Sequence, residues 1–112
     1  MAGQRDLSEL IERLEAFETR NVVRLEGLYA KIEDLDPELY MEVYGEVHAT
    51  DGTEIATDLE IVISAHDTLG RVVATSSAYL SADTFFAFDV FSTSFQVPQS
   101  DIVKVRVYPK PS

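Results

Sequence analysis

The sequence predicts a mainly β protein, an antiparallel β-sandwich of the immunoglobulin or fibronectin-III type with six to seven strands and one N-terminal amphipathic α-helix. The clearest observation is a period of two in residues 59–66, which sends one set of side chains into a core and the other outward. Asp67 and Gly70 then supply a turn, and the β-rich run 71–75 completes a hairpin. The inward set is Leu59, Ile61, Ile63 and Ala65, and the outward set is Glu60, Val62, Ser64 and His66.

The helix signal begins at Asp6, which can cap a first turn while Glu9 reaches back in a capping box. Apolar residues follow at spacings of three and four and form one stripe, which should end between residues 19 and 21. Because such a helix is marginal alone, the stripe must either pack on the domain's own sheet or pair with another copy. The stripe, a candidate partner-binding surface, consists of Leu7, Leu10, Ile11, Leu14 and Phe17.

We therefore divide the chain into a tail and helix (1–20), a β-sandwich domain (21–108) and a C-terminal tail (109–112). Residues 22–33 fit either a helix or a strand. We interpret them as a strand, because Val22 and Val23 are β-branched and Gly27 weakens a helix interior. The apolar alternation changes phase at Gly27, as a β-bulge would require. Asp36 and Pro37 then mark a turn.

The next strand spans residues 38–50 and has a well-defined alternation. Gly45 falls on its inner face, where close packing would call for no side chain. The inward residues are Leu39, Met41, Val43, Val47 and Ala49; the outward ones are Tyr40, Glu42, Tyr44, Glu46 and His48. Tyrosine is enriched at interfaces, so Tyr40 and Tyr44 are candidate partner-binding residues. The alternative is that this row only forms cross-strand pairs on a solvated sheet face.

Two more strands complete the sandwich. Residues 85–91 place Phe86, Phe88 and Val90 on one face and Phe85 and Phe91 on the other. A strand with aromatic residues on both faces is central, or its second face is covered, for example by the N-terminal helix. After a turn at residues 98–101, the last strand spans residues 102–108. Its inward residues are Val103, Val105 and Val107, and prolines at 109 and 111 end it.

Composition limits the classes of function. The chain has 112 residues, enough for one domain with a hydrophobic core, and no cysteine. Its net charge of −11, from nine basic and twenty acidic residues, disfavours nucleic-acid and anionic-membrane binding. No run approaches the roughly 18 apolar residues of a membrane span. Acidic residues interrupt the apolar N-terminal stretch, which argues against a signal peptide, and we expect a cytoplasmic protein.

No catalytic set is evident, so we expect neither an enzyme nor a cofactor. The serines lack a nucleophile-elbow or Ser-x-x-Lys pattern. His48 and His66 both lie on outward faces of predicted strands, and a metal site built from them with Glu46 or Asp67 is not predicted. Loop aspartates could hold calcium at one end of a sandwich, although no EF-hand spacing is present. Those aspartates are Asp34, Asp36, Asp51, Asp67 and Asp83.

Residues 39–108 resemble the bacterial immunoglobulin-like modules of the FxLYD kind. The resemblance rests on residues 43–47 (VYGEV), on the hairpin 59–80 with Asp67 and Gly70 at its turn, and on the Phe-rich strand before a valine-alternating last strand. The chain departs from the family at residues 64–67, where SAHD replaces a Phe-x-Leu-Tyr-Asp run. The resemblance implies an adhesion or interaction module with no catalytic residues.

These observations favour a non-enzymatic interaction or assembly module. It would self-associate as a homo-oligomer, or dock a protein partner, through the N-terminal helix and an aromatic sheet face. One alternative is a C2-like sandwich that binds calcium or another ligand through loop aspartates. A further alternative is an acidic inhibitor or mimic that occupies a basic site on another protein.

Overall fold

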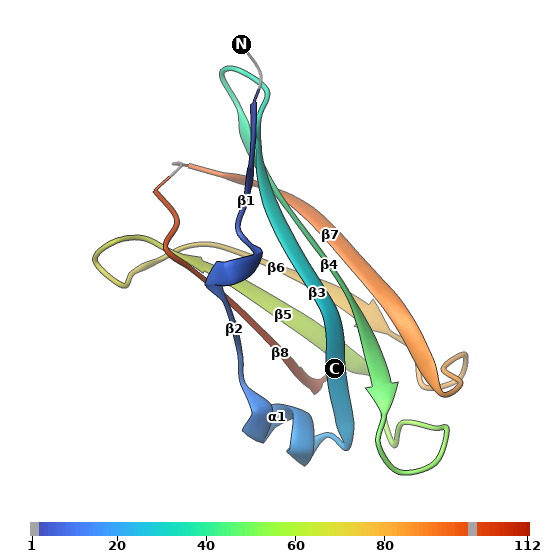
Figure 1. Cartoon of the computed structure of the whole chain (residues 1–112). Helices are drawn as coiled ribbons and strands as arrows, with labels where there is room; N and C mark the ends of the chain where they lie inside the picture. The colour runs from blue at the N-terminus through green and yellow to red at the C-terminus, as the bar shows by residue number, and fades with distance from the viewer. Residues whose placement is uncertain (1–2, 99–100) are drawn as a thin grey trace.

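The computed structural model describes residues 3–98 and 101–112 and contains two four-stranded β-sheets (Figure 1). The first sheet has the order β1-β3-β4-β7, and the second has the order β2-β8-β5-β6. The strands of the first sheet are β1 (Gly3–Asp6), β3 (Val23–Asp34), β4 (Leu39–Ala49) and β7 (Phe88–Val97). Those of the second are β2 (Ile11–Arg13), β8 (Lys104–Pro111), β5 (Leu59–His66) and β6 (Val72–Leu80). The predicted β-rich sandwich is confirmed, with eight strands in the described residues rather than six or seven.

The strand order differs from that of an immunoglobulin domain. Here β3 and β4 form a hairpin within the first sheet, and β5 and β6 form a hairpin within the second. If β1 and β2 are taken together as strand A, β3 and β4 would be strands B and C, which lie in opposite sheets of an immunoglobulin domain. The structure therefore supports the two-layer sandwich without the immunoglobulin strand order.

The prediction of one amphipathic helix beginning at Asp6 is wrong. Residues 3–13 form β1, a 3-10 turn (Ser8–Leu10) and β2, and α1 (Glu15–Arg20) is the only α-helix among the described residues. The segment crosses from the first sheet, where β1 pairs antiparallel with β3, to the second, where β2 pairs parallel with β8. Leu7 lies at the crossover, 1% exposed, and its N–H donates to the Ala30 carbonyl oxygen at 2.7 Å. Pairing with sheet edges and core burial override the local helical pattern.

The core between the sheets follows the predicted alternation. The inward residues of β5 are 0–1% exposed, and Met41, Val43 and Val47 of β4 are fully buried opposite them. The bulge at Gly27 is confirmed, because the β3–β4 register shifts between Glu26 and Tyr29 and Gly27 has a φ of +61°. The Pro37 turn joins β3 to β4, as predicted.

Two predictions near the C-terminus need correction. Val103 is 46% exposed rather than inward, because β8 begins at Lys104, two residues later than predicted, and Ile102 takes the buried place. Residues 109–111 belong to β8 rather than to a tail, with Pro109 opposite Ile61. The prolines are tolerated because β2 pairs with β8 only as far as Val107, which leaves that side of β8 an edge. The predicted turn at 98–101 includes residues 99 and 100, which lie outside the described residues.

The Phe-rich strand is also placed differently from its prediction. β7 is an edge strand of the first sheet, and α1 packs against β3 and β8 rather than over it. Phe85 and Phe91 are buried, whereas Phe86, Phe88 and Val90 are 72%, 52% and 63% exposed. The predicted division of this strand into two faces is confirmed, but its second face is left open.

Candidate functional site on the outer face of the first sheet

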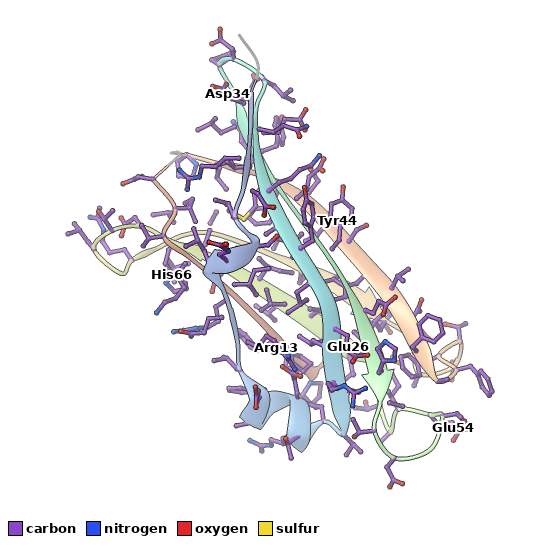
Figure 2. The ribbon with its side chains drawn as sticks, viewed as in Figure 1. Arg13, Glu26, Asp34, Tyr44, Glu54 and His66 are labelled. Carbon is purple, nitrogen blue, oxygen red and sulfur yellow. The ribbon has the colours of Figure 1, made fainter. Side chains whose placement is uncertain are left out.

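The outer face of the first sheet carries a group of exposed apolar side chains from β3, β4 and β7. Tyr29 and Tyr44 are each 40% exposed, and Phe88 and Val90 are more exposed still, so no described element covers them. The strand register explains the grouping, because Tyr29 pairs with Tyr44 and the next outward residues of β4 lie opposite Val90 and Phe88. We call the group Tyr29, Tyr44, Phe88 and Val90 the aromatic face. Figure 2 shows Tyr44 projecting from the sheet away from the second layer.

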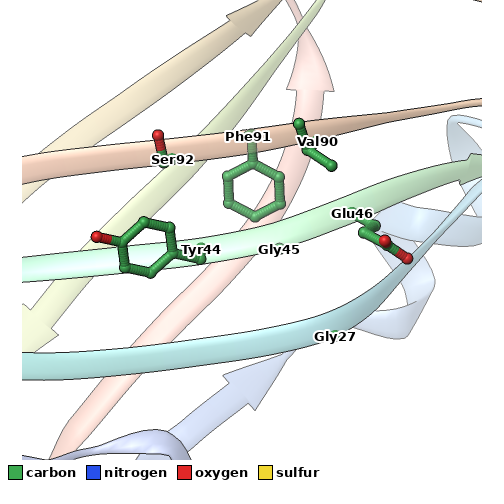
Figure 3. A pocket seen from close by; sticks show the side chains of 7 residues that line it. All are labelled: Gly27, Tyr44, Gly45, Glu46, Val90, Phe91 and Ser92. Carbon is green, nitrogen blue, oxygen red and sulfur yellow. The ribbon is translucent and has the colours of Figure 1, made fainter.

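A hollow of about 440 Å³ lies beside Tyr44 on this face (Figure 3). Gly27 at the bulge keeps it open because it has no side chain. Gly45 contributes only backbone to the hollow, because a Cβ at this position would point inward at Leu28 and Phe91. Side chains from β4 and β7 form its walls. The full lining consists of Gly27, Tyr44, Gly45, Glu46, Val90, Phe91 and Ser92. The hollow could accept an apolar side chain of a few carbon atoms.

Tyr44 is held in place by its neighbours. Its ring centroid lies 5.9 Å from that of Tyr29, and its hydroxyl donates to Glu42 Oε2 at 2.7 Å. Lys31 Nζ lies 3.3 Å from the same carboxylate oxygen. The Tyr44 hydroxyl, and after it Lys31, lowers the pKa of Glu42, and the same hydrogen bond raises the pKa of Tyr44. Tyr44 thus presents its ring in one orientation and loses little side-chain entropy when a partner covers it.

The other end of the face carries a cluster of ionisable groups. His48 Nε2 lies 2.9 Å from Glu46 Oε1 and 3.0 Å from Glu26 Oε2. The imidazole ring also stacks on Phe88, with centroids 5.3 Å apart and planes at 14°. Sequence reasoning considered His48 with Glu46 but missed Glu26. That residue comes from the neighbouring strand, and only the β3–β4 register places it opposite Glu46.

The structure separates the residues that the sequence grouped as partner-binding. Tyr40 is half-buried on the same outer side of β4 as Tyr44, but it lies four residues away along the strand. Leu7 is in the core, and Leu10 and Ile11 are half-buried against it, so they do not form an exposed stripe. Leu14 and Phe17 lie instead over the outer face of the second sheet, where the Phe17 ring is 5.2 Å from that of Tyr108.

That second outer face holds His66 in a different setting. His66 is 6% exposed rather than on an open surface, and its Nε2 lies 2.9 Å from Ser64 Oγ. The pair lines a groove of about 410 Å³ beneath Leu14 and Phe17. Asp67 does not complete a Ser–His–Asp set, because its carboxylate oxygens accept hydrogen bonds from Leu69 and Arg71 in the β5–β6 turn. His48 and His66 lie in different sheets, so they cannot share a metal ion.

The loop aspartates are not brought together. Within residues 3–98 and 101–112, only Glu26, Glu46 and His48 form a group of three or more potential metal ligands. Figure 2 shows Asp34 at the β3–β4 turn and Glu54 in the β4–β5 loop at opposite ends of the sheet. In the described part of the chain, no helix is long and apolar enough to cross a membrane.

Comparison of the chain with known protein families, with curated proteins and with solved structures finds no match.

Proposed function

We propose that this protein is a non-enzymatic interaction module and that the aromatic face binds a protein partner. The supporting observation is the aromatic face itself, with the hollow between Tyr44 and Val90. Protein interfaces use aromatic side chains as anchors, and their partners fill pockets at the centre of the contact. The rigid sheet keeps these groups in place before binding, which reduces the entropy that association must overcome.

The charges around the face favour a basic partner. Glu26, Glu33, Glu42 and Glu46 all project from the same side of β3 and β4. Two basic side chains on this side already form ion pairs, Arg24 with Glu26 and Lys31 with Glu42. We therefore expect an apolar side chain flanked by Lys or Arg on the partner. A second copy of this chain would bring another acidic face and a net charge of −11, so self-association is disfavoured.

The experiment compares two exposed tyrosines on different sheets, each of which donates a hydrogen bond to a carboxylate. Tyr44 donates to Glu42 on the first sheet, and Tyr79, 60% exposed, donates to Asp58 at 2.6 Å on the second. Cross-linking and co-purification from the native cell should recover a partner with the wild type and with Tyr79→Ser. Tyr44→Ser and Val90→Glu should each weaken binding of the purified partner by about tenfold or more. Added salt should also weaken binding.

Equal partner binding by all four proteins would contradict the proposal. Light scattering on the purified chain tests self-association separately. A dimer that dissociates in Tyr44→Ser but persists in Tyr79→Ser would show that the occupant is a second copy and that the inferred basic partner is wrong.

A further inference from the structure

Three potential ligand atoms converge at the edge of the aromatic face. They are His48 Nε2 and one carboxylate oxygen each from Glu26 and Glu46, all within 4.8 Å of one another. His48 and Glu46 are two residues apart on β4, and Glu26 lies directly opposite Glu46 on β3. Ligands carried on paired strands have little freedom to separate, so the convergence is a property of the sheet rather than of a loop.

Two carboxylate oxygens compete for a single ring nitrogen in this cluster. An imidazole nitrogen carries at most one hydrogen, yet two carboxylate oxygens lie 2.9 and 3.0 Å from His48 Nε2. A metal ion can satisfy all three atoms at once. Tetrahedral zinc, with bonds of about 2.0–2.2 Å, places its ligand atoms about 3.3 Å apart, so small side-chain rotations would suffice.

Neighbouring side chains already orient two of the ligands. Arg24 Nε lies 3.2 Å from Glu26 Oε1, which leaves the other oxygen directed at His48. The Phe88 ring stacks on the imidazole and fixes its plane. Outer partners of this kind orient the ligands in natural metal sites. All three ligand residues are partly exposed, so an ion can enter from solvent.

We propose that Glu26, Glu46 and His48 bind one zinc ion, with the fourth coordination position open to solvent beside the hollow. The imidazole nitrogen distinguishes this site from calcium and magnesium sites, which use oxygen ligands. The two carboxylates would neutralise the two positive charges of the ion. The net charge of −11 on the chain also favours cation binding in general. The inference does not depend on the proposed partner, because the site is complete within one chain.

Calorimetric titration of the full tag-free chain with zinc chloride at neutral pH tests the proposal. One saturable site is expected, and zinc should raise the melting temperature because it binds only the folded state. Glu26→Gln, Glu46→Gln and His48→Gln should each weaken zinc binding by about tenfold or more. The control Glu54→Gln, an exposed acid in the β4–β5 loop, should bind zinc as the wild type does. Magnesium and calcium at the same concentration should give no comparable shift.

Absence of a saturable site would overturn the proposal, as would equal zinc binding by the cluster variants and the wild type. Equal shifts with calcium and zinc would also overturn it, because they would indicate general attraction to acidic groups. NMR of the wild type supplies a reading that does not require a variant to fold. Zinc must perturb the His48 imidazole signals and leave those of His66 unchanged. The partner experiment uses no added metal, so the two proposals can fail independently.

Discussion

At the residue scale, the Asp67 carboxylate closes the turn between β5 and β6. Oδ1 accepts hydrogen bonds from the N–H groups of Leu69 and Arg71 at 2.9 and 3.0 Å, and Oδ2 accepts one from Arg71 Nε at 2.9 Å. The side chain is 1% exposed. These hydrogen bonds, led by the one from the Arg71 backbone, lower the pKa of Asp67 below its ordinary value of 3.8.

Asp67 should therefore make stability depend on pH in the acid range. Because its pKa is lower in the folded state, its stabilisation is complete above the ordinary value of 3.8 and is lost as the pH falls through the folded value. Asp67→Asn should lower the free energy of unfolding near neutral pH and flatten its decline in acid. Urea unfolding at about pH 7 and about pH 3 measures both effects. The exposed Asp51→Asn is the control, and an Asp67→Asn profile parallel to the wild type would contradict this role.

Gly45 is a second residue with a specific role, because its close neighbours leave no room for a side chain. A Cβ built at this position would lie 2.6 Å from Leu28 Cδ2 and 2.7 Å from Phe91 Cε1. Gly45→Ala should destabilise the protein by about 1–3 kcal/mol, because the buried Phe91 ring has little room to move. Denaturant unfolding checks the value. At Gly3 a Cβ would meet no atom within 4 Å, so Gly3→Ala should leave stability nearly unchanged, and a neutral Gly45→Ala would show that Phe91 can repack.

At the element scale, α1 covers an open edge of β3. β1 pairs with β3 only over residues 31–34, so none of the described strands pairs with the first part of β3 on that side. Glu18 of α1, 3% exposed, accepts a hydrogen bond from the Leu25 N–H at 2.9 Å. Arg13 holds the same carboxylate with two hydrogen bonds of 2.7 and 3.1 Å. The helix therefore protects a strand edge that could otherwise pair with another chain.

Glu18→Ala should loosen this element. It leaves the buried Leu25 N–H without an acceptor, which should cost about 1–3 kcal/mol of stability. Hydrogen exchange at the Leu25 amide should accelerate more than exchange at amides of β5. Glu15→Ala removes an exposed acid from the same helix and should change neither quantity. Unchanged Leu25 exchange in Glu18→Ala would mean that α1 does not protect the edge.

At the scale of the whole molecule, two sheets enclose one core, and their outer faces differ. The outer face of the second sheet is partly covered by Leu14 and Phe17, whereas the aromatic face of the first is open. This asymmetry makes the first sheet the better candidate for binding. The core depends on side chains such as Val105 and Val107 of β8, which are 0% exposed and pack between the layers.

Val105→Asp should unfold the domain or cost several kcal/mol, because it buries an unpaired carboxylate between the sheets. Val103→Asp is a matched control on the same segment, since Val103 is 46% exposed and should tolerate the change. Circular dichroism and thermal melts distinguish the two variants. A folded Val105→Asp protein, or an unfolded Val103→Asp protein, would contradict the orientation of β8.

Much of the fold could be predicted because alternation is a local property. The inward residues of β5, the bulge at Gly27 and the close packing at Gly45 follow from residue type and spacing alone. The N-terminal segment could not be predicted in this way. Leu7, Leu10, Ile11 and Leu14 fit a helical stripe by spacing, but strand edges of both sheets were available to pair with them.

By itself, the sequence determined that the chain folds as a β-rich domain, where most of its turns lie and which side chains of β4 and β5 point inward. Those features depend on neighbouring residues, whose alternation and backbone preferences act locally. Only the tertiary structure decided which sheet each strand joins, that β7 leaves its aromatic residues uncovered, and that Glu26 meets Glu46 and His48. These features depend on strand pairing between residues far apart in the chain, and the pairing minimises exposed edges and buries apolar area over the whole molecule.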